Sequence, residues 1–448
     1  MFQKIGSVIL ALFLFLPSAA AATLPKYPPI PSLLSVSVKG KETKQQNGSI
    51  LSVYSPSTAN GAVTKDLNGI ISGYIDRIAP TLPEGKRTPE ESKLDIRCIY
   101  SLTGESWLSF TILARTVYHR QTMSEEITTR TYDMESGRQI QLTDIFDQDS
   151  PAWALLSDAV RAQLGAYFPA DTAQAGALDA LITRDALENA PFSLGAVKME
   201  LLYPASLVYP GRTTLMRVKV YYKDVSGMMT EEAAKQTDNS RYPMIALTFD
   251  DGPRYVGTVD LLDTLQVYGA KATFFLIGDQ MEKHRDVVQR EHDEGHTVAS
   301  HTWNHYDPRN LTVEELFANK AQFDSMLSSI TGTTAPFMRA PGGRYQEFVK
   351  SGIGLPLIQW SVISGDIKTE KYKDIAQTVL GNARHGGIIL MHDSRDATVK
   401  SMTRLLSFLR KKGFLCVTVE DLFVQNNMEL LPNTVYRDAN GWIETDGL

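Results

Sequence analysis

An apolar run that ends in two carboxylates occupies residues 244–253, which read MIALTFDDGP. Short apolar runs of the same kind follow it, separated by stretches with helical periodicity. Short continuous apolar runs that alternate with helices are typical of parallel strands covered on both faces. The pattern predicts an α/β fold, and the number of runs favours a distorted parallel (β/α)7-type barrel over a small open sheet. The runs lie at residues 244–249, 272–277, 297–299, 337–338, 357–362, 388–391 and 414–419.

Polar residues able to do chemistry stand where several of these runs end. In a parallel barrel the carboxyl ends of the strands meet on one face, so residues far apart in the sequence form one site. Seven of the eight histidines lie between residues 284 and 392, which places most of the metal-binding capacity in this half of the chain. The strand-end candidates are Asp250, Asp251, His301, His305, Arg339, Asp366 and His392.

These residue types suit a hydrolytic metal site. The imidazoles of His301 and His305, four residues apart, can bind one metal ion, and a carboxylate completes three protein ligands. A remaining coordination position would hold a water molecule, and zinc lowers the pKa of such a bound water towards about 7. Adjacent carboxylates point in different directions, so one of Asp250 and Asp251 can bind the metal while the other accepts a proton. An amine leaving group also needs a proton, and His392 is the candidate general acid.

Five segments, in order along the chain, resemble the motifs of the NodB-homology polysaccharide deacetylases, carbohydrate esterase family four. The resemblance covers roughly residues 242–425, and five ordered motifs are far more specific than any single short pattern. The N-terminal region resembles a module that precedes the catalytic part of secreted peptidoglycan deacetylases. The five segments are TFDDGP at 248–253, HTWNH at 301–305, RAPGG at 339–343, WSVISGD at 360–366 and LMH at 390–392.

The resemblance implies a role for each matched residue. Arg339 would pair with the catalytic base and hold it ionised, and Asp366 would orient the general acid and favour its protonated form. The backbone N–H of Gly342 would face the oxyanion beside the metal. The metal itself would be Zn²⁺, with Co²⁺ as the alternative. The remaining assignments are Asp250 as catalytic base, His392 as general acid, and Asp251, His301 and His305 as metal ligands.

Three positions depart from the family pattern. Ile363 and Ile367 stand where the fourth motif usually has an aspartate and a tryptophan, and Gly342 stands in a place usually held by an aromatic residue. Because Asp366 is retained, the partner of the general acid is intact. These departures are expected to reshape the sugar groove and to affect substrate specificity more than catalysis.

The implied activity is metal-dependent removal of N-acetyl groups from an amino-sugar polymer, by a hydrolase acting on carbon–nitrogen bonds other than peptide bonds. Peptidoglycan is the preferred substrate, and a chitin-like oligosaccharide is a second candidate. Two alternatives stay open: an O-acetyl esterase acting on xylan or another glycan, and an inactive glycan-binding protein. A net charge of -6 does not indicate the strongly basic surface that is typical of nucleic-acid-binding proteins.

The N-terminus has the pattern of a secretory signal peptide. Lys4 precedes an apolar run at residues 8–16, and small residues at 19–22 supply a cleavage site. The run is much shorter than the roughly 20 residues that span a bilayer. Residues 1–22 are therefore expected to be removed, which leaves no stable membrane anchor and a secreted protein, extracellular or in the cell envelope.

The rest of the chain divides by pattern. Residues 26–224 mix helical and strand periodicities, which predicts a separate α+β accessory domain of unknown function whose scattered acids lie on solvated faces. The polar stretch 225–241 indicates a linker or a short surface helix, residues 242–425 form the catalytic domain, and residues 426–448 form a C-terminal tail over the surface.

Two further expectations concern cysteine and histidine. The two cysteines, Cys98 and Cys416, lie in apolar patterns and are interpreted as buried thiols, since a disulfide would have to join different domains. His292 and His296 are surrounded by acidic residues. They are interpreted as structural residues at an exposed helix end.

Overall fold

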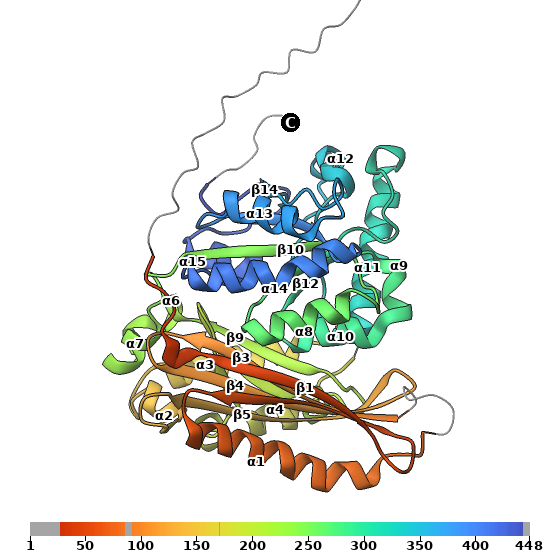
Figure 1. Cartoon of the computed structure of the whole chain (residues 1–448). Helices are drawn as coiled ribbons and strands as arrows, with labels where there is room; N and C mark the ends of the chain where they lie inside the picture. Colours follow the sequence, from red (N-terminus) through yellow and green to blue (C-terminus); the bar gives the residue numbers. More distant parts are fainter. Residues whose placement is uncertain (1–26, 86–91, 170, 442–448) are drawn as a thin grey trace, which may run out of the picture.

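The computed structural model describes residues 27–85, 92–169 and 171–441. The predicted signal peptide, residues 1–22, lies outside them. The protein is of mixed α/β type, and its two halves stack on each other (Figure 1). The strands of the second half lie above a large N-terminal sheet, with helices α8 (Thr258–Tyr268) and α10 (Arg285–Asp293) between the two.

The N-terminal half is built on a six-stranded sheet in sequence order, with one parallel pair, β2 with β3, among antiparallel ones. Helix α1 (Gly61–Ile78) makes that parallel crossover and packs its buried side against one face of the sheet. Asn60 caps the helix by accepting hydrogen bonds from the N–H groups of Ala62 and Val63. The strands are β1 (Val36–Lys44), β2 (Ile50–Thr58), β3 (Ser92–Thr103), β4 (Trp107–Tyr118), β5 (Gln121–Asp133) and β6 (Gln139–Ile140).

A smaller antiparallel sheet follows, formed by β7 (Phe192–Leu194), β8 (Lys198–Pro204) and β9 (Leu215–Tyr221). Its apolar face packs on α3, and the two share one hydrophobic core. The helices before this sheet are α2 (Leu142–Ile145), α3 (Ala152–Gly165), α4 (Ala175–Leu181) and α5 (Arg184–Glu188).

The second half contains most of the parallel strands expected from the apolar runs, but the run 337–338 contributes only isolated bridges through Met338, and the run 357–362 is divided between β13 and β14. Every strand pair in it is parallel, with β10 between β11 and β15, β12 beyond β11, and β14 beyond β15. Met338 bridges Ser300, the last residue of β12, to Leu357 in β13. Strand β14 follows β13 in the chain after residues 359–361. The strands are β10 (Met244–Gly252), β11 (Thr273–Leu276), β12 (Thr297–Ser300), β13 (Leu357–Ile358), β14 (Val362–Ile363), β15 (Ile388–His392) and β16 (Leu415–Val417).

Helices alternate with these strands and bury apolar side chains against them. Strand β10 is buried along almost its whole length, which explains why its sequence is continuously apolar rather than alternating. Besides α8 and α10, the helices are α9 (Gly278–Met281), α11 (Val313–Thr331), α12 (Gln346–Ser351), α13 (Tyr372–Asn382), α14 (Asp396–Lys411) and α15 (Val419–Gln425).

Buried ion pairs join the two halves. The N-terminal region itself also has acids with buried side chains, Asp95 and Glu125, where solvated ones were expected. Arg97 of β3 pairs with Asp263 of α8 at 2.5 Å, and Lys198 of β8 pairs with Asp421 of α15 at 2.6 Å. Asp293 at the end of α10 is fully buried, where it pairs with Arg115 and accepts a hydrogen bond from Thr214. In each pair the N-terminal half supplies the cation and the second half supplies the acid.

The same contact explains the two histidines expected at an exposed helix end. His292 and His296 are both buried, because the N-terminal half covers this end of α10. The ring Nδ1 of His296 accepts a hydrogen bond from the N–H of Ala272, and burial lowers the pKa of His296 well below its usual value. The two residues are structural, as expected, but they are not exposed.

Two segments expected to be loosely attached are built into the fold. Helix α6 (Tyr222–Val225) ends where residues 225–241 begin, and α7 (Glu231–Thr237) lies inside them. The buried side chains of Gln236 and Asn239 accept hydrogen bonds from the turn between β3 and β4. In the segment expected to be a surface tail, β17 (Val435–Tyr436) pairs with β13, and Tyr436 is buried.

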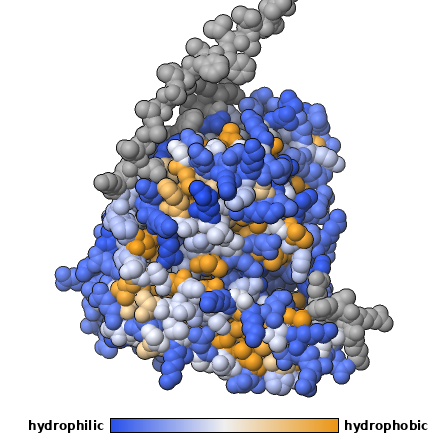
Figure 2. Space-filling model, viewed as in Figure 1, coloured by the Kyte–Doolittle hydropathy of each residue, from blue (hydrophilic) through white to orange (hydrophobic). Residues whose placement is uncertain are grey.

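Cys98 and Cys416 are both free thiols, as expected, but only Cys98 is fully buried, and Cys416 is partly buried. Within the described residues, no helix combines the length and the apolar character needed to cross a membrane. On the face of the molecule seen in Figure 2, apolar residues form separate patches among hydrophilic ones.

Replacing Asp293 with alanine is expected to destabilise the protein by about 1–3 kcal/mol, because the buried Thr214 hydroxyl loses its acceptor and the buried Arg115 keeps only one of its two carboxylate partners, Glu125 at 2.8 Å. The free energy of unfolding from urea denaturation measures the effect. The matched control is Asp179→Ala, which breaks the exposed pair with Arg161 and should cost less than about 1 kcal/mol. Equal losses in the two variants would contradict the importance assigned to the buried contact.

Candidate active site

Two adjacent carboxylates leave the end of β10 in different directions. Asp250 lies opposite His392 in the parallel register with β15, and its side chain is buried. Asp251 has a φ of 75°, in the left-handed region, which turns its side chain away from that of its neighbour. The side chain of Asp251 is 32% exposed and that of Asp250 only 5%. The local backbone thus gives the two acids separate surroundings.

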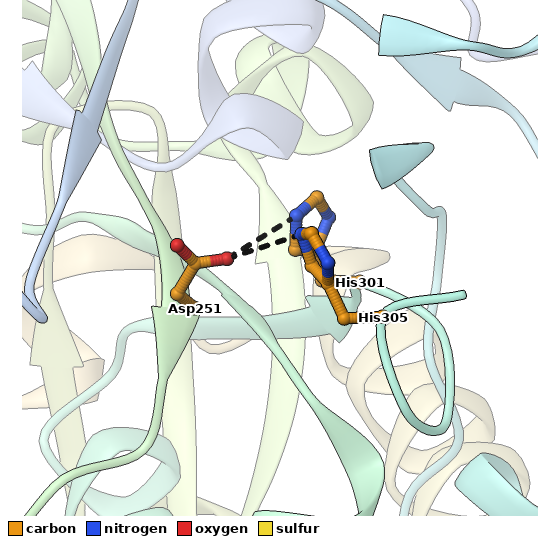
Figure 3. Close-up of side chains that lie close together, drawn as sticks. All are labelled: Asp251, His301 and His305. Carbon is orange, nitrogen blue, oxygen red and sulfur yellow. Dashed lines mark ion pairs between the residues drawn. The ribbon is translucent and has the colours of Figure 1, made fainter. Parts of the chain in front are cut away.

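Asp251 faces two imidazoles that come from the segment after β12 (Figure 3). Its Oδ1 lies 3.6 Å from Nε2 of His301 and 3.5 Å from Nε2 of His305. Positive φ values at Thr302 and His305, together with a hydrogen bond from the N–H of His305 to the Thr302 hydroxyl, form the tight turn that brings the second imidazole round.

This donor set fits a zinc-type ion. Ligand bonds of about 2.0–2.2 Å in tetrahedral geometry separate donor atoms by roughly 3.4 Å, close to the observed spacings. The ligand atoms of Asp251, His301 and His305 all lie within 4.8 Å of one another. Nδ1 of His301 is 2.8 Å from the backbone oxygen of Arg339, a contact that directs Nε2 towards the shared centre.

Arg339 is the fully buried support of the other carboxylate. Its Nη1 donates to Oδ1 of Asp250 at 2.7 Å and to the hydroxyl of Thr248 at 2.8 Å. Its Nε and Nη2 donate to the backbone oxygens of Ile358 and Gln359. With its donors held on several sides, the guanidinium fixes Asp250 in place. Oδ2 of Asp250 is then left towards the metal ligands, 3.9 Å from Nε2 of His301.

His392, at the end of β15, is held by Asp366. Its Nδ1 lies 3.0 Å from Oδ1 of Asp366, and its backbone N–H donates to Oδ2 at 2.7 Å. Burial lowers the pKa of His392, but the hydrogen bond and charge of Asp366 outweigh burial and leave that pKa raised. The ring therefore stays protonated to higher pH than an ordinary histidine. Its Nε2 is the nitrogen free to deliver a proton to a bound molecule.

Gly342 and the two isoleucines that depart from the family pattern lie beside these groups. Gly342 follows Arg339 in a short turn and has a φ of 61°. Ile363 and Ile367, on either side of Asp366, are 51% and 58% exposed. Tyr306, next to His305, is 55% exposed. The surface around the polar centre is thus apolar in several places.

Sequence reasoning missed residues that support the site from behind. The hydroxyl of Thr398, at the start of α14, donates to Oδ2 of Asp366 at 2.8 Å. Asp393 is buried behind Gly252, and burial raises its pKa to about 7. Its position directly after His392 was the available signal for Asp393. Thr398 had none, because its contact depends on how α14 packs.

Known proteins resemble this chain across the same region. The model of the polysaccharide deacetylase family matches residues 237–353. Peptidoglycan-N-acetylglucosamine deacetylase PgdA of Listeria monocytogenes is 31% identical over 65% of this chain, which spans 63% of the length of that relative. A peptidoglycan-N-acetylglucosamine deacetylase of Bacillus cereus is 33% identical over 40% of this chain and 87% of its own.

A third relative is named for a different sugar. Peptidoglycan-N-acetylmuramic acid deacetylase PdaC of Bacillus subtilis is 26% identical over 68% of this chain and 69% of its own. A solved structure of PdaC has a TM-score of 0.41 and 28% identity, over 42% of this chain and 94% of that one.

Replacing Asp366 with asparagine is expected to lower the pKa of His392, because burial then acts without the opposing negative charge. The protonated form should be lost at lower pH than in the unaltered protein. Titration of the His392 ring protons by NMR, assigned with His392→Gln, measures the shift. Thr398→Ala, which keeps the charge of Asp366, is the control and should move the pKa less. An unchanged pKa in Asp366→Asn would contradict the pairing.

Proposed function

Because this chain belongs to the polysaccharide deacetylase family, whose members are hydrolases of carbon–nitrogen bonds, we propose that it removes N-acetyl groups from an amino-sugar polymer, with peptidoglycan as the favoured substrate. One observation carries the proposal. A three-donor metal group, a carboxylate fixed by a buried arginine and a histidine with a raised pKa all meet at the ends of β10, β12 and β15.

Asp251, His301 and His305 would hold the metal, with Zn²⁺ favoured and Co²⁺ as the alternative. The chemistry that the ion supplies when bound is polarisation of the acetyl carbonyl and acidification of water. The exposed side of this group is suited to admit substrate, since the side chain of His305 is 45% exposed.

The remaining steps belong to the protein's own side chains. Asp250, oriented by Arg339, accepts a proton from water at Oδ2 as the new C–O bond forms. The N–H of Gly342 stabilises the developing oxyanion. Nε2 of His392 then gives its proton to the amide nitrogen as the C–N bond breaks, so that acetate and a free amine leave. Asp366 holds Nδ1 of that ring throughout.

The architecture and cellular location are part of the same proposal. Residues 242–425 would form the catalytic domain, a distorted (β/α)7-type barrel, and residues 26–224 an accessory domain that packs against it. The sequence pattern of residues 1–22 supports export, so the protein would act outside the cytoplasm, where peptidoglycan is found.

Acetate release from N-acetylated peptidoglycan tests the activity directly. The zinc-loaded full chain should release acetate, a chelator should abolish the release, and added Zn²⁺ or Co²⁺ should restore it. Acetylated xylan is assayed in parallel. Acetate from xylan with none from any N-acetylated glycan would replace the proposal with an O-acetyl esterase, and no acetate from either would favour an inactive glycan-binding protein.

Substitution of the two adjacent aspartates, Asp250 and Asp251, should affect different properties of the protein, turnover in one case and metal binding in the other. Asp250→Asn should retain metal and lose about 10²–10⁴-fold in turnover, the usual contribution of a positioned base. Asp251→Asn should bind zinc more weakly, because it loses the carboxylate that faces both imidazoles. Metal content by elemental analysis, measured beside turnover, separates the two. Equal loss of metal from both variants would refute the division of roles.

A further inference from the structure

A half-exposed arginine, Arg344, joins two of the loops that carry the site. Its Nη1 donates to Oδ2 of Asp307 at 2.9 Å. Asp307 stands two residues after the metal-ligand candidate His305, and Arg344 stands two residues after Gly342. The ion pair therefore spans from the loop of the metal group to the loop of the oxyanion N–H.

The guanidinium lies directly over Gly342. A Cβ atom built on this glycine would lie 3.9 Å from Cζ and Nη1 of Arg344 and 4.0 Å from Nε, and no other atom outside the adjacent residues is nearer. The guanidinium thus lies within van der Waals contact distance of the Cβ position of residue 342, beside the N–H proposed to face the oxyanion. The Arg344 side chain is 49% exposed, so much of its surface can meet a bound molecule.

The local charge is positive. Asp307 also accepts hydrogen bonds from Nε and Nη2 of Arg309, so one carboxylate faces two guanidinium groups. An arginine has five N–H donors, and among the described residues Arg344 uses only Nη1, on Asp307. The unused donors form the planar fork that suits a carboxylate.

We propose that Arg344 binds a carboxylate carried by the glycan next to the acetamido group, so that the site selects acidic amino-sugar polymers over neutral ones. The inference rests on the proposed deacetylase function. In peptidoglycan, muramic acid carries a lactyl group on the ring carbon next to the one that bears the acetamido group. The carboxylate is either that of the free lactyl group or one belonging to the peptide attached to it. Chitin and xylan carry neither.

Steady-state kinetics of the zinc-loaded full chain test this on glycans of equal length. The substrates are an N-acetylglucosamine tetramer, a peptidoglycan tetrasaccharide with free lactyl carboxylates, the same glycan with its peptides, and both acidic glycans with their carboxylates amidated. The unaltered protein should have higher kcat/KM on an acidic glycan than on the neutral tetramer, and amidation should remove the advantage.

Arg344→Gln should reduce that preference roughly 10- to 100-fold, the value of a hydrogen bond to a charged group, mainly through KM. Arg344→Lys should keep part of it, because the charge remains without the planar fork. The acidic glycan on which the loss appears identifies the lactyl group or the peptide as the source of the carboxylate.

Arg309→Gln is the matched control. Arg309 also pairs with Asp307 and is 61% exposed, but its atoms are not among those nearest Gly342. This variant should keep the preference for acidic glycans. Equal rates of the unaltered protein on acidic and neutral glycans, or the same loss in Arg309→Gln as in Arg344→Gln, would overturn the inference. An absence of acetate from every N-acetylated glycan would instead count against the deacetylase function itself.

Discussion

The buried ion pair between Arg339 and Asp250 is the contact on which the organisation of the site rests. A charge taken out of water is costly unless a partner and hydrogen bonds compensate it. Arg339 meets this requirement by donating to Asp250 and Thr248 of β10 and to the backbone of residues 358 and 359. The pair therefore fixes the distance between β10 and the chain that follows β13.

The location of the site on the parallel strands follows from that geometry. Asp250 lies near the end of β10, directly opposite His392 of β15, so a single strand register sets these two side chains beside each other. The backbone oxygen of Arg339 also lies within hydrogen-bond distance, 2.8 Å, of Nδ1 of His301. Arg339 thus orients Asp250 through its side chain and His301 through its backbone, which links two side chains that the sequence keeps far apart.

The sequence could predict the parallel strands and the strand-end residues because both depend on local pattern. Continuous apolar runs indicate strands covered on both faces. Strand β11 lies within such a run, and β10, β12 and β15 coincide with runs that they extend at their carboxyl ends. The contact between the halves could not be predicted in this way. The sequence around Asp293 has the pattern of a solvated helix end. The burial of Asp293 is favourable only because Arg115 and Thr214, from a distant part of the chain, pair with its carboxylate. Gln236 and Asn239, in a polar stretch, are buried for the same reason.

Burial also separates most residues of the proposed catalytic centre from the exposed residues around it. Asp250, His301, Arg339 and Asp366 are buried and tied to several partners, so a change at any of them disturbs a network. Departures from the family pattern occur at the exposed Ile363 and Ile367 and at Gly342, whose Cβ position has no close backbone neighbour. Substitution of the two isoleucines would alter the exposed surface without touching that network, whereas the positive φ of Gly342 disfavours any other residue at its position. A chain can therefore keep the proposed hydrolytic centre and act on a different polymer. In this chain Arg344, beside Gly342, adds a positive charge to the surrounding surface.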